Sequence, residues 1–342
     1  MQLLATFTTL FIGGIGGLVA WLVGAPVPFL TGPATLVTIA ALFGVKCVVN
    51  TYIRNISFII IGISIGSSVN PQVLDAAKLW PTTIFGMGFS LVTLIFVGKL
   101  LLQKLFNFEP NAALLASCPG HLSYVLSLSE ETKSDTTRIA IIQSIRVLTL
   151  TLAIPATIAL STNYSLQIFE INLAKISWVH FLLLFLISIA LGFIILKIKF
   201  PAAFLLGGMI SSSLGHGFDF TPGVAPAFLS IGAFMILGSL IGSRFSGVDL
   251  KKLKENIFVG TFFTVLALAI SILFAYAFSI LSGFRFVDVL IAFAPGGLET
   301  MVAMGSIVNA DAAFVAFHHL IRLFFLSALI PFFISNYKQS QE

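Results

Sequence analysis

Apolar stretches of about 20 residues recur along the whole chain, and they limit what it can fold into. Examples are 80–102 and 257–281. A run of about 20 apolar residues is long enough to cross a bilayer as a helix. Only 9% of the 342 residues are charged, whereas soluble domains carry about a quarter. The sequence therefore predicts an all-α polytopic membrane protein, whose main partner is the lipid bilayer.

The apolar stretches fall into two sets that follow one another along the chain. The first set spans 3–23, 28–45, 56–69, 80–102, 112–129 and 136–160. The second set spans 178–196, 202–217, 226–245, 257–281, 287–307 and 312–335. We therefore predict a first membrane repeat over 1–160, a linker over 161–176 and a second membrane repeat over 177–342.

Residues with special backbone or charge properties match between the two sets at a nearly constant offset. The matches pair Pro26 with Pro201, Pro119 with Pro295, Gly120 with Gly296, and Arg146 with Arg322. Apolar residues can match by chance in such a chain. Proline, glycine and arginine that keep one offset are hard to explain that way, so we interpret the second half as a copy of the first.

The fifth segment of each repeat contains a Pro-Gly pair, at Pro119-Gly120 and at Pro295-Gly296. Proline pushes the preceding residue out of the helical region, and glycine accepts a turn. Two interpretations follow. Each segment is either a re-entrant hairpin that enters and leaves the membrane on one side, or a kinked helix that crosses it fully.

The distribution of basic residues favours the hairpin. With a cytoplasmic N-terminus, the hairpin arrangement places only Lys78, Lys175 and Arg285 outside, among the Lys and Arg residues near segment ends. Basic residues concentrate on the cytoplasmic side of membrane proteins. We therefore predict two inverted repeats in the bacterial inner membrane. Each has about five transmembrane helices plus a Pro-Gly-broken re-entrant hairpin, and both termini are cytoplasmic.

Most ionisable residues within predicted spans lie between 294 and 322. This stretch holds Glu299, His318, His319 and Arg322 in an apolar background. An ionisable residue at membrane depth is costly and therefore marks a candidate functional site. Glu299 follows the Pro-Gly break, so it either caps a half-helix or carries a proton or cation.

Arg146 and Arg322 allow two interpretations each. Arginine has five donors and stays charged, so it could tie a helix to the carbonyl groups that a break frees. It could also bind an anion beside half-helix N-termini. We favour the structural role for Arg146 and the functional role for Arg322.

The two histidines can change protonation near neutral pH, and they are adjacent, so they point to different faces of a helix. We expect no metal site, no catalytic residue and no cofactor. The candidate substrate- or ion-binding residues are Pro119, Gly120, Arg146, Pro295, Gly296, Gly297, Glu299, His318, His319 and Arg322.

Two segments carry a family resemblance, WLVGAPVPFLTGP at 21–33 and APGGLETMVAMG with ADAAFVAFHHLIRLFF within 294–325. They resemble the bacterial membrane AbrB family, which is also labelled as an ammonia monooxygenase and is built on an internal duplication. The resemblance implies a duplicated inner-membrane protein with an effect on gene expression. It also implies a family motif at Pro295, Gly296, Gly297, Glu299, His319 and Arg322.

Three function classes remain open. The repeats, breaks and buried ionisable residues favour a secondary transporter of a small molecule or ion, with an anionic solute as one candidate. The alternatives are a membrane monooxygenase and a membrane regulator of gene expression without transport. We expect no direct nucleic-acid partner, because the longest polar stretches are too short for a DNA-binding module. A homo-oligomer is an open option.

Overall fold

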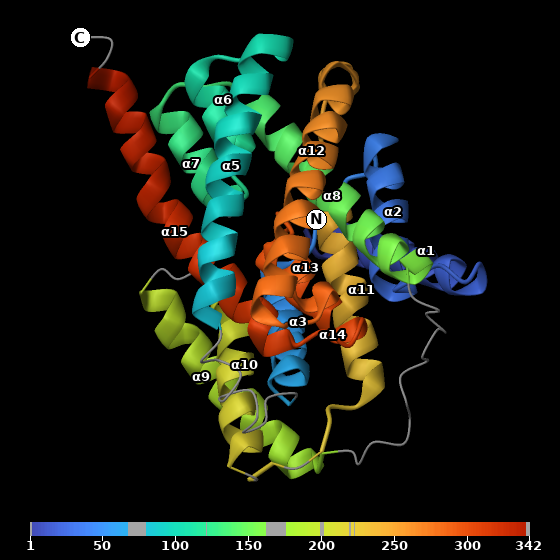
Figure 1. The fold of residues 1–342 in the computed structure, drawn as a ribbon. Helices are drawn as coiled ribbons and strands as arrows, with labels where there is room; N and C mark the ends of the chain where they lie inside the picture. Colours follow the sequence, from blue (N-terminus) through green and yellow to red (C-terminus); the bar gives the residue numbers. More distant parts are fainter. Residues whose placement is uncertain are drawn as a thin grey trace. The chain divides into compact units, whose positions relative to one another are not determined.

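Every secondary-structure element of the computed structural model is an α-helix within the described residues (Figure 1). The helices result from long apolar sequences in which each backbone amide and carbonyl group finds its partner four residues away. The structure describes residues 2–67, 80–120, 122–161, 176–198, 202–218, 220–221 and 223–339, although some side chains inside these ranges are not described.

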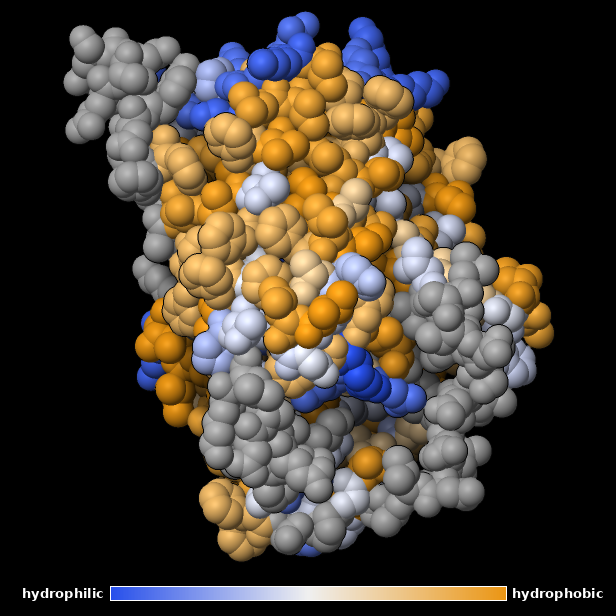
Figure 2. Space-filling view, viewed as in Figure 1, coloured by the Kyte–Doolittle hydropathy of each residue, from blue (hydrophilic) through white to orange (hydrophobic). Residues whose placement is uncertain are grey.

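Among the described residues, 5 helices are long and apolar enough to cross a membrane. They are α1 (Gln2–Leu22), α5 (Trp80–Phe106), α8 (Thr136–Ser161), α9 (Trp178–Lys197) and α12 (Leu250–Ser282). Their outward side chains are apolar, and Phe7 and Phe11 of α1 are each 71% exposed. Hydrophobic residues cover most of the visible face in Figure 2. Exposed apolar surface on this scale marks contact with lipid.

The two segments with Pro-Gly pairs are broken, as the sequence predicts. The first consists of α6 (Pro110–Ser117) and α7 (Leu122–Glu131). The second consists of α13 (Phe286–Phe293) and α14 (Leu298–Ile307). The long helix α15 (Ala312–Gln339) follows. In both segments the first short helix starts at residues 176 apart, and so does the second, which matches the offset of the proposed copy.

The helices group into two compact units. The first unit comprises residues 1–76, 151–247 and 302–313. It contains α1, α9 and four shorter helices, α2 (Pro28–Leu42), α3 (Thr51–Gly66), α10 (Ala203–Gly217) and α11 (Ala227–Ser243). Here α3 packs on α10, and α2 packs on α11. Each of these contacts therefore joins a helix of the first predicted repeat to one of the second.

Glycines allow the backbones of these paired helices to touch. A Cβ atom added to Gly208 of α10 would lie 2.6 Å from the carbonyl oxygen of Ile59 in α3, and one added to Gly62 would collide with the Leu205 carbonyl group. Small residues at helix contacts are a main source of packing in membranes, because there is no hydrophobic driving force between helices in lipid.

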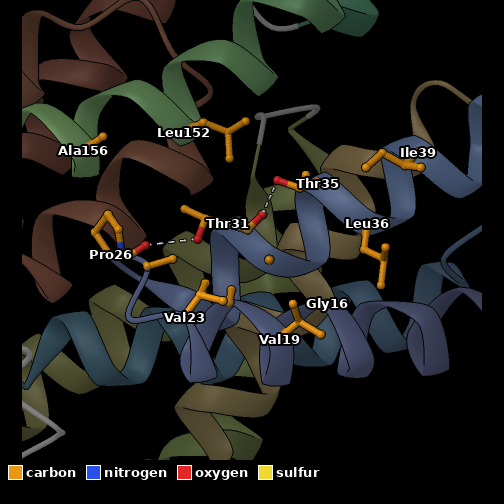
Figure 3. A pocket seen from close by; sticks show the side chains of 13 residues that line it. Gly16, Val19, Val23, Pro26, Thr31, Thr35, Leu36, Ile39, Leu152 and Ala156 are labelled. Carbon is orange, nitrogen blue, oxygen red and sulfur yellow. Dashed lines mark hydrogen bonds between the residues drawn. The ribbon is translucent and has the colours of Figure 1, made fainter.

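The first unit also holds an apolar groove of about 430 Å³ (Figure 3). It is lined by residues of α1, α2 and the turn between them, together with Leu152 and Ala156 of α8. The hydroxyl groups of Thr31 and Thr35 donate to backbone carbonyl groups at 3.0 and 2.8 Å. None of its lining residues is ionisable, so this groove is separate from the predicted site residues.

The second unit comprises residues 77–150, 248–301 and 314–342. In it α5 packs on α12, while α6 packs on α5 and α13 on α12. Gly98 of α5 allows close approach, because a Cβ atom there would lie 2.6 Å from Phe263 and 2.8 Å from the hydroxyl group of Ser117. Both broken segments therefore start on a scaffold of two long helices.

Each compact unit takes segments from both predicted repeats, so the repeats are units of sequence. The predicted linker, 161–176, lies almost entirely outside the described residues. Two helices start earlier than predicted because side chains cap them. Asn50 accepts from the amide of Tyr52 at the start of α3, and Asp249 accepts from that of Lys251 at the start of α12.

Substitution of Gly208 by Ala should lower the free energy of unfolding by about 1–3 kcal/mol, because the new methyl group overpacks the contact with α3. The control is Gly232→Ala in α11, where a Cβ atom would have no neighbour within 4 Å. That change should raise stability by up to about 1 kcal/mol through helix propensity. Thermal unfolding of the purified chain in detergent measures both, and equal effects would contradict the role assigned to packing.

Candidate functional site

Both breaks lie in the second unit, and proline causes each of them. Helix α6 ends at Ser117, and Cys118 before Pro119 is extended, with φ −75° and ψ 121°. Helix α13 ends at Phe293, and Ala294 before Pro295 is extended, with φ −56° and ψ 131°. Proline excludes the helical conformation from the residue that precedes it. The carbonyl groups at the ends of α6 and α13 therefore need partners from elsewhere.

Arg322 of α15 supplies partners in the second break. One terminal nitrogen of its guanidinium group donates to the carbonyl oxygen of Ala294 at 2.7 Å. The other donates to the carbonyl oxygen of Gly296 at 2.6 Å. The planar fork of the arginine thus holds both sides of Pro295, a geometry that a lysine ammonium group cannot reproduce.

Two further side chains complete this break. Nε2 of His319 lies 3.0 Å from the carbonyl oxygen of Ile291 and donates to it. The hydroxyl group of Ser271 in α12 donates to the carbonyl oxygen of Phe293 at 3.2 Å. His319 and Arg322 are on one face of α15 because they are three residues apart, so one helix holds the end of α13.

Gln143 and Arg146 of α8 do the same work in the first break. The side-chain amide of Gln143 donates to the carbonyl oxygens of Leu115 at 3.0 Å and Cys118 at 2.9 Å. Arg146 donates to the carbonyl oxygen of Cys118 at 3.3 Å and to the side-chain oxygen of Gln143. The end of α6 is thus held by an amide and a guanidinium group together.

The two sets of contacts match at the offset of 176 residues. Gln143 and His319 occupy matching positions, and the carbonyl groups that they hold also match. The same is true of Arg146 and Arg322 with the carbonyl groups of Cys118 and Ala294. Gln143 was not among the site residues predicted from the sequence. The offset, together with the need to satisfy a broken helix, could have found it.

Both arginines are buried, each only 1% exposed. A charged side chain at the bilayer centre costs about 3 kcal/mol or more, and carbonyl dipoles at a helix C-terminus recover up to about 2 kcal/mol of this. The structure therefore gives both arginines the carbonyl contacts that were predicted as the main role of Arg146 alone. This leaves the functional role of Arg322 as a proposal.

His318 has different partners from its neighbour. Its Nδ1 donates to the carbonyl oxygen of Phe314 at 2.8 Å, and its Nε2 lies 2.8 Å from the hydroxyl group of Thr83 in α5. The ring of Trp80 lies beside it, with centroids 6.3 Å apart. His318 therefore contacts α5, while His319 contacts the end of α13, as expected for adjacent residues on one helix.

The other predicted residues lie in or beside the breaks. Pro119, Pro295 and Gly296 are buried, whereas Gly120 and Gly297 are partly exposed. The backbone of Glu299 belongs to the first turn of α14, but its side chain lies outside the described part of the structure, so its pairing with Arg322 stays a prediction. Among the described residues, no three His, Cys, Asp or Glu side chains form a group that could hold a metal ion.

Replacing His319 by Gln should leave stability nearly unchanged, because Gln143 already holds the matching carbonyl group with an amide. His319→Leu should lower the free energy of unfolding by about 1–3 kcal/mol, since it leaves the buried Ile291 carbonyl group without a partner. Thermal unfolding in detergent compares the two variants. Equal losses would show that the ring has a role other than this hydrogen bond.

The family model described as "Transition state regulatory protein AbrB" matches residues 29–337 of the chain. The chain is 28% identical over 295 residues to "Uncharacterized protein YhjN" of Bacillus subtilis (strain 168), covering 80% of this chain and 75% of the relative. It is 22% identical over 289 residues to "Putative regulator AbrB" of Escherichia coli (strain K12), covering 81% of each. These matches confirm the resemblance seen in the sequence, and the chain belongs to the AbrB family.

Proposed function

We propose that this chain is a secondary transporter of a small solute, with the two breaks as its binding site. In this proposal the chain has two inverted repeats, each with about five spans and one re-entrant hairpin. Secondary transporters commonly bind solutes at broken helices near the membrane midplane, where two inverted repeats meet. The paired breaks of the second unit fit that pattern.

The observation that carries the proposal is that the chain keeps two breaks, each with a buried arginine. An unbroken helix would satisfy its own carbonyl groups and would need no charged partner. The broken form needs Arg322 and Arg146, each of which is costly to bury. A pure packing role does not explain why both features are retained. A solute that uses the irregular backbone does explain it.

Two buried polar atoms in the second break support a ligand there. Nε of Arg322 and Nδ1 of His319 have no hydrogen-bond partner among the described residues, and each residue is at most 1% exposed. Buried polar atoms are normally satisfied. Helix α14 begins in the same break, and its first amides favour an anion. We therefore propose an anionic solute.

The alternatives fit the site less well. A copper or iron oxygenase needs several histidines or carboxylates that converge on one point. His318 and His319 instead contact separate backbone groups on different helices. The family description and the Escherichia coli relative both carry the word regulator or regulatory. We propose that any effect on transcription is indirect, through the solute that is moved.

Proteoliposomes that contain the purified chain should move one of the compounds whose level changes in a deletion strain. Untargeted metabolite profiling of cells and medium selects these compounds, and flux of each into proteoliposomes is then measured. Arg322→Ala should lower the flux at least tenfold, because it opens the second break. Arg285→Ala is the control, since its side chain is 64% exposed.

The variant series also tests the predicted pairing. If Glu299 pairs with Arg322, the double variant Arg322→Ala with Glu299→Gln should retain more flux than Arg322→Ala alone, because the single change leaves a charge buried without its partner. Strictly additive losses would show that the two residues do not interact. A substrate and product that interconvert in the vesicles, without net movement, would contradict transport.

Reporter fusions test the orientation. A fusion after Glu131 and a fusion at the C-terminus should both report a cytoplasmic location, and a fusion within 161–176 should report a periplasmic one. This follows from the distribution of Lys and Arg under the re-entrant arrangement. A periplasmic signal after Glu131 would instead support a first broken segment that crosses the membrane.

A further inference from the structure

The carbonyl groups at both breaks already have cationic partners from the chain itself. In transporters with broken helices, unwound carbonyl groups and half-helix C-termini commonly coordinate the coupling sodium ion. Here the carbonyl oxygens of Ala294 and Gly296 accept from Arg322, and that of Cys118 accepts from Arg146. The positions that would bind a metal cation are therefore occupied by guanidinium groups.

We propose that Arg322 and Arg146 take the place of the coupling sodium ions, so that the chain binds its solute without sodium. This inference rests on the proposed transport function and adds its ion dependence. It concerns the protein's fixed charges. The solute is left with the half-helix N-termini and the polar atoms of the second break that have no partner among the described residues.

The geometry of the second break carries the inference furthest. The two bonds of Arg322, at 2.7 and 2.6 Å, are as short as charge-assisted hydrogen bonds become. They join carbonyl groups on either side of Pro295, which are the oxygens that a sodium ion at this half-helix end would need. The arginine is 1% exposed, so water does not compete for these oxygens.

A sodium ion added here would meet two fixed positive charges. The charge of Arg146 already acts on Arg322 inside the same unit. In the low dielectric of a buried site, the repulsion between like charges is much stronger than in water. The same charges attract a solute anion, which makes sodium unnecessary for solute binding as well as unfavourable at the breaks.

Thermal unfolding of the wild-type chain in detergent tests the first consequence. The midpoint should be the same in sodium, potassium, lithium and choline chloride at equal ionic strength. A ligand that binds only the folded state raises the midpoint in a saturable way. A saturable, sodium-specific rise in the wild type would overturn the inference. The measurement needs no solute and no variant.

Arg322→Ala tests the second consequence, because it exposes the carbonyl groups that the arginine holds. The midpoint should fall by roughly 10 °C, and millimolar methylguanidinium chloride should restore part of it in a saturable way. Arg138→Ala is the matched control. Arg138 also donates to a carbonyl oxygen, that of Phe106, but it lies outside the breaks, so methylguanidinium should not restore it.

A folded Arg322→Ala variant that does not respond to methylguanidinium would overturn the inference. If that variant does not fold, Arg322→Lys replaces it. The lysine keeps the charge, so this variant should show a lower midpoint that is still insensitive to sodium, and a sodium-specific rise would again count against the inference. Failure of the transport function has a separate sign, since it would show as absent flux in proteoliposomes while the unfolding results stand.

Discussion

The second unit depends on one constraint, that carbonyl groups freed inside a membrane need donors from the protein. Lipid offers none, so each break must lie beside a helix that supplies them. Helices α8 and α15 do so with Gln143, Arg146, His319 and Arg322. The position of these helices against α6 and α13 is therefore set by hydrogen bonds to the backbone, and packing of apolar side chains fills the remaining space.

The first unit solves a different problem with the same materials. Its helices are unbroken, and their backbone groups are satisfied internally, so only packing can hold them together. Glycines such as Gly62 and Gly208 let α3 and α10 meet backbone to backbone, which is how helices gain contact area in lipid. The ionisable residues predicted as site candidates belong to the second unit. This division of labour explains why one unit is rich in small contacts and the other in buried charge.

Much of this organisation could be predicted from the sequence. The spans follow from apolar length, and both breaks follow from Pro119 and Pro295. The copied arrangement follows from residues that keep one offset. Helix starts were less predictable, because the cap by Asn50 depends on local turn geometry. The role of Gln143 was missed since an amide carries no charge and attracts no attention in an apolar chain. The partner of His318 on α5 depends on packing that no spacing pattern reveals.

The two breaks match in position but differ in chemistry, and this difference limits how they can work. In the first break a neutral amide holds Leu115, and the arginine bond is 3.3 Å long. In the second a titratable ring holds Ile291, and the arginine bonds are 2.7 and 2.6 Å. Only the second break can therefore change its hydrogen bonding with protonation. A duplicated carrier with this asymmetry would sense protons from one half, while the other half supplies a fixed positive charge in all states.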